Sequence, residues 1–183
     1  MGLHEEELPE IIDSWREANP KIVQYWWDTE KAAMTAYKTG ERQEVGKIAF
    51  EFYSGTLWMV LPSGRRLAYL KPKQQPNRFG RMSLTYEGVG QNHKWSRQET
   101  YSGRLVENAT QAIARDILAE AMDRISAEGL NIVAHVHDEV IIEAPKDQYT
   151  VDEVCKLMSV NPAWCKGLPL AAAGYKGSYY FKD

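Results

Sequence analysis

Two long stretches of the chain place apolar residues every three or four positions, a spacing that predicts helices. The first stretch contains Leu8, Ile11, Ile12, Trp15, Ile22, Val23, Trp26, Ala33 and Tyr37. Acidic residues precede it, which favours a helix start, and Asn19-Pro20 interrupts it. Residues 5–39 are therefore predicted to form two helices, the second ending near Gly40.

The second stretch predicts one helix over residues 102–128, ending before Gly129. Its apolar stripe steps by four residues through Leu105, Ala109, Ile113, Ile117, Ala121 and Ile125. Another face collects four long hydrogen-bonding side chains within about 60° of arc: Arg104, Asn108, Gln111 and Arg115. A solvated face would more commonly carry Lys and Glu, so this set favours a face that meets a ligand.

Between the helical stretches, short runs of alternating apolar residues predict β-strands. Turn residues at 54–55 and 62–64 separate these runs, so antiparallel strands are predicted at 48–52, 57–61 and 65–70.

The remaining segments have weaker patterns. Residues 71–103, rich in Pro, Gly, Lys, Arg and Gln, are predicted to form a long basic loop with one strand near 83–86. A short helix is predicted at 150–159 and a final strand at 168–180. Helices and antiparallel strands in separate segments predict the α+β class.

Two apolar, β-branched runs flank the polar sequence HVHDEV, residues 135–140. This pattern predicts a β-hairpin over residues 130–144, with His137, Asp138 and Glu139 at its tip. Acids at a turn need not be buried, which accounts for carboxylates in the middle of an apolar segment.

Composition is that of an ordinary globular chain, with 44% hydrophobic and 26% charged residues among 183. The sequence contains no run of about 18 apolar residues and no secretory signal pattern, so a membrane span is excluded and a cytoplasmic location is expected. Cys155 and Cys165 are expected to be free thiols. A zinc site combining them with His135 and His137 is an alternative, although the spacing fits no known pattern.

Charge is distributed unevenly around a net value of −3. Residues 1–30 carry a net −6, whereas residues 65–104, called the basic stretch below, carry nine bases against two acids, a net +7. The bases are Arg65, Arg66, Lys71, Lys73, Arg78, Arg81, Lys94, Arg97 and Arg104. The aromatic residues among them are Tyr69, Phe79, Tyr86, Trp95 and Tyr101. This combination suits a polyanion such as nucleic acid, and the alternative is a solvated basic surface.

The hairpin acids offer hard oxygen ligands of the kind that Mg²⁺ prefers. Because neighbouring residues on a hairpin point to opposite sides, at most one of Asp138 and Glu139 faces a given site. A two-metal phosphoryl-transfer site needs further carboxylates, so Asp138 supplies half of such a site. The alternative is a polar turn without catalytic function.

The segments HVHDEVIIEAP and RLVENATQAIARDIL together resemble the C-terminal palm of family A DNA polymerases, the DNA polymerase I type, and in particular its phage-encoded branch. The family's motif C, [QH]-V-H-D-E, matches residues 135–139. Two weaker similarities are LPSGRR at 61–66, which is similar to a -DGRR- segment, and NPKIVQYW at 19–26, which is similar to a -YPGV- segment.

The resemblance implies a role for each matched residue. Asp138 would be the second catalytic aspartate, which binds the Mg²⁺ ions, and Glu139 its supporting carboxylate. His137 would contact the primer end.

The resemblance also implies that Arg104, Asn108 and Gln111 contact the minor groove of the primer–template and the templating region. Family members commonly have three residues between this Asn and Gln, whereas two stand here, so Gln111 departs from the pattern.

Motif A, which supplies the first aspartate, and motif B of the fingers are absent from these 183 residues. The expected organisation is a helical remnant of the fingers at 1–40 and a palm subdomain at 41–183. The resemblance implies primed DNA template, dNTP and the missing N-terminal polymerase portion as partners, and the chain alone is expected to be inactive. Two alternatives are a catalytically silent DNA-binding remnant and a metal-dependent phosphohydrolase that uses His135, His137 and Asp138.

In the family, the motif A strand lies beside the motif C hairpin. Without it, the hairpin is expected to expose a strand edge and an apolar face, which favours a homodimer or aggregation. A monomer in which another strand covers this edge is the alternative.

Overall fold

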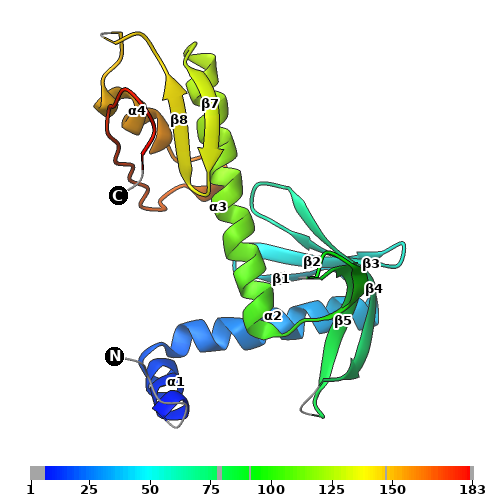
Figure 1. Ribbon diagram of the computed structural model, residues 1–183. Helices are drawn as coiled ribbons and strands as arrows, with labels where there is room; N and C mark the ends of the chain where they lie inside the picture. The colour runs from blue at the N-terminus through cyan, green and yellow to red at the C-terminus, as the bar shows by residue number, and fades with distance from the viewer. Residues whose placement is uncertain (1–6, 78–79, 91, 147, 182–183) are drawn as a thin grey trace. The chain divides into compact units, whose positions relative to one another are not determined.

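The computed structural model describes residues 7–77, 80–90, 92–146 and 148–181 (Figure 1). It confirms the α+β class, with helices and antiparallel sheets in separate segments. The chain forms two compact units, called the first unit (residues 1–110) and the second unit (residues 111–183). Among the described residues, none of the helices combines the length and the apolar character that crossing a bilayer requires. Two of the acidic residues that precede the first helix, Glu5 and Glu6, lie outside the described residues. Arg78 and Phe79 of the basic stretch also lie outside them.

The two predicted N-terminal helices are confirmed as α1 (Leu8–Ala18) and α2 (Pro20–Thr39). Pro20 occupies the first turn of α2, where its missing N–H costs nothing, and the chain changes direction sharply there (Figure 1). Gly40 ends α2 with φ +74°, and its N–H donates to the Ala36 carbonyl. Glycine adopts this left-handed conformation at little cost, which explains the helix end.

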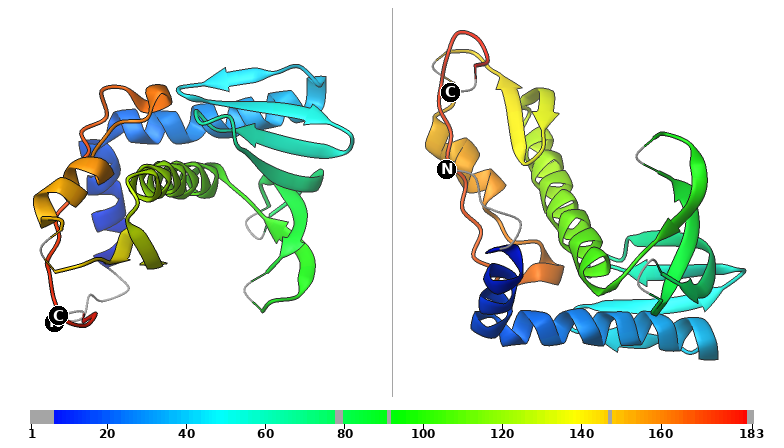
Figure 2. Two further views of the ribbon diagram at one scale, coloured as in Figure 1. Left: turned by 90° about the horizontal axis from the view of Figure 1, so that it is seen from above. Right: turned by 60° about the horizontal axis from the view of Figure 1, so that its bottom comes forward.

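The first unit also contains a six-stranded antiparallel sheet in which each strand pairs with its neighbours in sequence. Its strands are β1 (Gln43–Val45), β2 (Ile48–Tyr53), β3 (Thr56–Val60), β4 (Arg66–Pro76), β5 (Met82–Val89) and β6 (Trp95–Glu99). Helix α2 packs on β1, β2 and β3 (Figure 2). The residues buried in these elements include Ala33, Ala36, Phe50, Leu57 and Met59. Burial of this apolar surface is the main stabilisation of the unit.

Tight turns set the register of the first strands. Ser54 and Gly55 form the two-residue turn between β2 and β3, both with positive φ, as the strand twist requires. Gly46 has φ +58°, and a Cβ placed on it would lie 2.9 Å from the Tyr25 ring. A side chain at position 46 would therefore push the β1–β2 turn away from α2.

The predicted strand near 83–86 is confirmed as part of β5, but the prediction of a long loop around it, over 71–103, is wrong because most of this segment belongs to β4, β5 and β6. Lys, Arg and Gln replace apolar residues on these strands, so the alternation that marks a strand is absent from the sequence. Pro72 is accommodated at a register shift between Leu70 and Lys73, next to Lys71 with φ +44°. A proline lacks the N–H for a strand ladder and is tolerated at such an irregularity.

The long helix is confirmed as α3 (Ser102–Ala127), whose first turns belong to the first unit and the rest to the second. The second unit further contains β7 (Asn131–Val136), β8 (Glu139–Glu143), α4 (Val151–Met158) and the 3₁₀ turn η2 (Ala163–Cys165). The predicted hairpin is thus confirmed and forms a separate two-stranded sheet. Arg124 of α3 donates to the carbonyls of Leu157 at 3.1 Å and Val160 at 2.9 Å, which ties the helix to the end of α4.

The prediction of a final strand at 168–180 is also wrong, because this segment is irregular. Pro169 cannot donate to a ladder, and the alanines and glycines that follow have low strand propensity. Instead, Asn161 donates to the Leu168 carbonyl at 2.6 Å, and a Cβ on Gly174 would lie 3.3 Å from Val151. The segment therefore lies close against α4.

Candidate active site and nucleic-acid interface

The polar tip of the hairpin is a two-residue turn. Val136 pairs with Glu139 across the ladder, which leaves His137 and Asp138 as the turn residues. His137 has φ +53°, and two-residue hairpin turns require a positive φ at their first position. Both side chains are exposed, so the structure confirms that the Asp138 carboxylate is presented at a turn and not buried.

The neighbouring acid, Glu139, has a different environment. It is the first residue of β8 and is half-buried. The Tyr180 hydroxyl donates to a Glu139 carboxylate oxygen at 3.2 Å. The two adjacent acids are therefore distinct, with Asp138 exposed at the tip and Glu139 engaged by the C-terminal segment.

A magnesium site can be tested against these positions. The Asp138 carboxylate has the donor chemistry that Mg²⁺ requires. Among the described residues, however, no three His, Cys, Asp or Glu side chains gather closely enough to hold a metal ion. The donor chemistry thus fits, but the described residues alone do not supply enough ligands for a metal site. The same observation gives no support to a zinc site or to a three-residue phosphohydrolase centre within the part of the chain that the structure describes.

The first turns of α3 place two of the predicted DNA contacts. The Arg104 guanidinium donates to the Glu99 carbonyl at 3.1 Å and lies 5.7 Å from the centre of the Tyr101 ring. The Asn108 amide donates to the Tyr69 hydroxyl of β4 at 3.0 Å. Arg104 and Asn108 are both half-buried.

The other two members of this helical face, Gln111 and Arg115, are exposed and lie on the part of α3 that belongs to the second unit. The structure therefore confirms that all four residues lie on one continuous helix.

Internal ion pairs neutralise part of the basic stretch. Glu87 on β5 accepts from Lys71 at 2.9 Å and pairs with Arg97 at 3.2 Å. The hydrogen bond from Lys71 lowers the pKa of the Glu87 carboxyl below its usual value. Arg66 is likewise paired with Glu51 at 3.4 Å. Glu87 is already counted in the net +7, whereas Glu51 lies outside residues 65–104, so the pair with Arg66 lowers the charge available to a polyanion below +7.

The aromatic residues of this stretch divide into two groups. Tyr69 is 2% exposed, so it cannot stack on a nucleic-acid base. Trp95 and Tyr101 are 59% and 53% exposed and remain available for stacking. The Tyr69 ring instead packs edge to face against Tyr86, with 5.1 Å between the ring centres.

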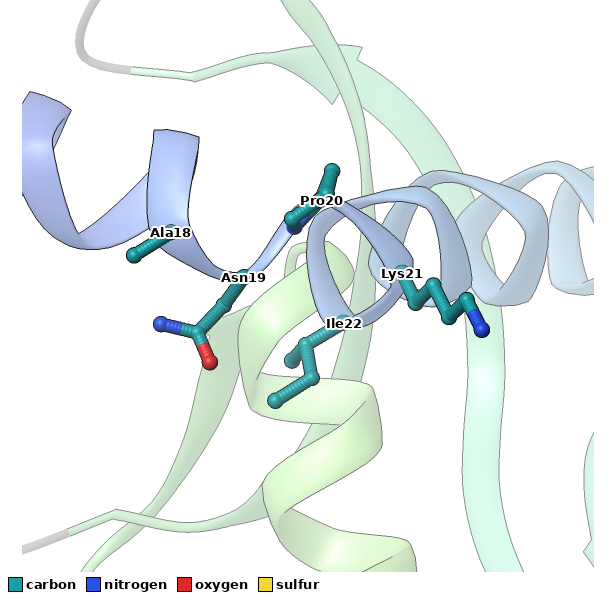
Figure 3. A pocket seen from close by; sticks show the side chains of 5 residues that line it. All are labelled: Ala18, Asn19, Pro20, Lys21 and Ile22. Carbon is teal, nitrogen blue, oxygen red and sulfur yellow. The ribbon is translucent and has the colours of Figure 1, made fainter.

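A shallow hollow of about 330 Å³ lies at the junction of α1 and α2 (Figure 3). Its lining is Ala18, Asn19, Pro20, Lys21 and Ile22. These residues include no carboxylate and no imidazole, so the hollow lacks the groups for acid–base or metal chemistry.

Sequence reasoning missed Tyr69 and Tyr180 as partners of site residues. They lie 39 residues from Asn108 and 41 residues from Glu139 in the chain. No spacing pattern links residues so far apart, and only the folded structure brings them together.

Comparisons with known proteins give one informative similarity. The chain is 48% identical over 187 aligned residues to the DNA polymerase of Bacillus phage SP02. The alignment covers 100% of this chain and 28% of that polymerase. No protein-family model matches the chain. No solved structure matches it either.

Proposed function

We propose that this chain forms part of a template-directed DNA polymerase of the DNA polymerase I type, contributing a catalytic hairpin and a DNA-contacting helix. The observation that carries the proposal is the similarity to a phage DNA polymerase over the whole chain. The exposed His137-Asp138 turn supports it, because it presents a solvent-accessible carboxylate of the kind that a catalytic metal site uses. If so, the polymerase would act in the cytoplasm of a bacterial host or of a phage-infected cell.

In this proposal, Asp138 holds Mg²⁺ together with the triphosphate of a dNTP and with carboxylates from a further polymerase segment. When bound, the ions neutralise charge that develops on the reacting phosphate. Glu139 supports the turn from β8, and its bond to Tyr180 fixes the direction of its carboxylate. His137, on the other turn position, would contact the primer end in this proposal.

The α3 face would hold the duplex. Arg104, Asn108 and Gln111 offer N–H donors, and the minor groove presents acceptors at purine N3 and pyrimidine O2 of every base pair. Such contacts fix the position of the primer without reading its sequence strongly. Positioning of this kind is a large part of phosphoryl-transfer catalysis.

A chimera tests the proposal directly. The matching segment of the phage SP02 polymerase is replaced by this chain, and primer extension is measured with Mg²⁺ and dNTPs. Template-directed extension by the chimera is the expected result. A folded chimera that binds primed DNA and extends no primer would contradict the polymerase assignment.

The 183-residue chain by itself is expected to show no template-directed incorporation. Its described residues do not assemble a carboxylate cluster, and one aspartate cannot fix two ions. Mg²⁺-dependent extension by the pure chain, abolished by Asp138→Asn, would contradict this expectation.

A catalytically silent DNA-binding protein is the second candidate, and the exposed aromatics and cations of the basic stretch favour it. Trp95 and Tyr101 are exposed, and so are Lys73 and Lys94. DNA binding by an inactive chimera would support this candidate over the polymerase.

Affinity for primed duplex DNA is expected to fall at least about tenfold between 50 and 200 mM salt, because each contacted phosphate releases counterions. Arg104→Ala should weaken binding by about 1–3 kcal/mol if its guanidinium makes a charge-assisted bond. Fluorescence anisotropy with labelled primer–template measures both effects. Arg16→Ala is the control, since Arg16 is exposed on α1, outside the basic stretch. Affinity that does not change with salt would identify the stretch as a solvated surface.

The chain is also expected to self-associate as a two-fold dimer through its hairpin. Strands β7 and β8 pair only with each other among the described strands, and Val133 on β7 is 53% exposed. Unpaired strand edges with apolar side chains seek partners. Sedimentation over a concentration series measures the association, and Val133→Lys should weaken it. A monomer at the highest concentration would exclude the dimer.

A further inference from the structure

The hydrogen bond between Tyr69 and Asn108 joins the sheet of the first unit to the proposed DNA-contacting helix. Asn108 Nδ2 donates to Tyr69 Oη at 3.0 Å. Tyr69 is 2% exposed, whereas Asn108 is half-buried at the surface of α3. A buried hydroxyl therefore contacts an amide that still reaches solvent.

The surroundings of Tyr69 hold its hydroxyl in place. Tyr69 pairs with Leu57 across the ladder between β4 and β3, and its ring packs against Tyr86 with an interplanar angle of 83°. Burial raises the pKa of Tyr69 to about 12. The phenol consequently stays protonated throughout the neutral range, and its oxygen remains a fixed neutral partner for the amide.

A fixed partner matters for asparagine in particular. The terminal torsion of an Asn side chain has a broad distribution, so an unrestrained amide samples many directions. Ordering such a side chain on binding costs free energy, and a bond present before binding removes part of that cost. The amide nitrogen has two protons, so one bond to Tyr69 leaves a second N–H for another acceptor.

We propose that Tyr69 is a positioning residue that orients the Asn108 amide toward acceptors in the minor groove of the primer–template duplex. This inference rests on the proposed function, because it takes primed DNA as the ligand of the α3 face. In this role the buried Tyr69 contacts Asn108 and does not contact the DNA bases.

Three variants of the full 183-residue chain test the inference by anisotropy with labelled primer–template. Asn108→Ala is expected to weaken binding about 3- to 10-fold, the value of one lost hydrogen bond. Tyr69→Phe, which keeps the buried ring, should weaken binding about 2- to 5-fold. The double variant should bind no more weakly than Asn108→Ala alone, because Tyr69 acts only through Asn108.

Tyr37→Phe is the matched control. Tyr37 on α2 also forms an edge-to-face pair, with Phe52 at 5.4 Å, and it lies outside the basic stretch. Removing its hydroxyl should leave DNA affinity unchanged. Circular dichroism of each variant checks that the fold is retained.

A substituted duplex separates positioning from a merely structural effect. Replacing purines near the primer end by 3-deazapurines removes minor-groove N3 acceptors. The wild-type chain should lose affinity for this duplex, whereas Tyr69→Phe and Asn108→Ala should lose distinctly less.

The outcomes distinguish DNA binding by the α3 face from the positioning role of Tyr69. Absence of salt-dependent binding by the wild-type chain would overturn the DNA-contacting role of the α3 face, and the inference with it, whereas primer extension by the chimera tests the polymerase assignment separately. Binding that Asn108→Ala weakens and Tyr69→Phe does not would overturn the role of Tyr69 alone. Additive losses in the double variant, with equal sensitivity to 3-deazapurines, would likewise overturn it.

Discussion

Asp138→Asn is expected to lower the rate of primer extension by the chimeric polymerase about 10³-fold or more. The substitution keeps the size of the side chain and removes its negative charge, so the attraction to a divalent cation is lost. A thousandfold change corresponds to about 4 kcal/mol in the activation free energy. Single-turnover extension at saturating DNA and dNTP measures this step.

Glu143→Gln provides the control for this substitution. Glu143 is exposed at the far end of the same hairpin, where it pairs with Asn131 across the ladder. The change from acid to amide is the same, and the rate should remain within about twofold of the unmodified chimera. If Asp138→Asn retained a tenth of the activity while binding DNA normally, Asp138 would not be a metal ligand.

Phe50→Ala is expected to reduce the free energy of unfolding of the first unit by about 3–5 kcal/mol. Phe50 is fully buried on β2, opposite Met59 on β3, so removing its ring would leave a cavity in the core. Urea denaturation followed by circular dichroism measures the difference.

Val89→Ala is the matched surface substitution for Phe50→Ala, because Val89 is 62% exposed on β5 of the same sheet. Its effect should stay within about 0.5 kcal/mol. A loss below about 1 kcal/mol for Phe50→Ala would mean that this ring does not lie in the core of the sheet.

The elements with strong apolar periodicity were predictable from sequence. Both N-terminal helices, α3 and the β7–β8 hairpin lie where the pattern places them. In α3 the periodic apolar residues Leu105, Ala109, Ala121 and Ile125 are buried, whereas those of α1 are 41–46% exposed. Proline and glycine marked the ends of α2 in the sequence, since Pro20 is its first residue and Gly40 follows its last. The position of Asp138 at a turn followed from the same pattern.

Strand β6 and the outer parts of β4 and β5, whose faces carry polar residues, were not predictable, although the predicted strand near 83–86 lies within β5. Strands β5 and β6 are stabilised by cross-strand polar contacts, such as Arg97 with Glu87 at 3.2 Å and with the Thr85 hydroxyl at 3.2 Å. Such contacts depend on which strands become neighbours, and composition gives no sign of them. Conversely, the apolar pattern of residues 168–180 is typical of a strand, yet none of the described strands pairs with this segment.

The candidate site shows the same division between local and long-range information. Residue types and spacing identified Arg104, Asn108 and Asp138, since these depend on one helix and one turn. The partners Tyr69 and Tyr180 come from distant parts of the chain and required the structure. The sequence placed Tyr69 among the aromatic residues of the basic stretch but gave no sign that it is buried.

The two compact units carry different natural reporter groups. Both cysteines, Cys155 and Cys165, are half-buried in the second unit. Five of the six tryptophans, all except Trp164, belong to the first unit. Tryptophan emission therefore follows mainly the first unit, and the rate at which a thiol reagent reacts follows the second. Unlabelled protein can thus reveal whether helix α3, which runs through both units, makes them unfold in one step or lets them open in turn.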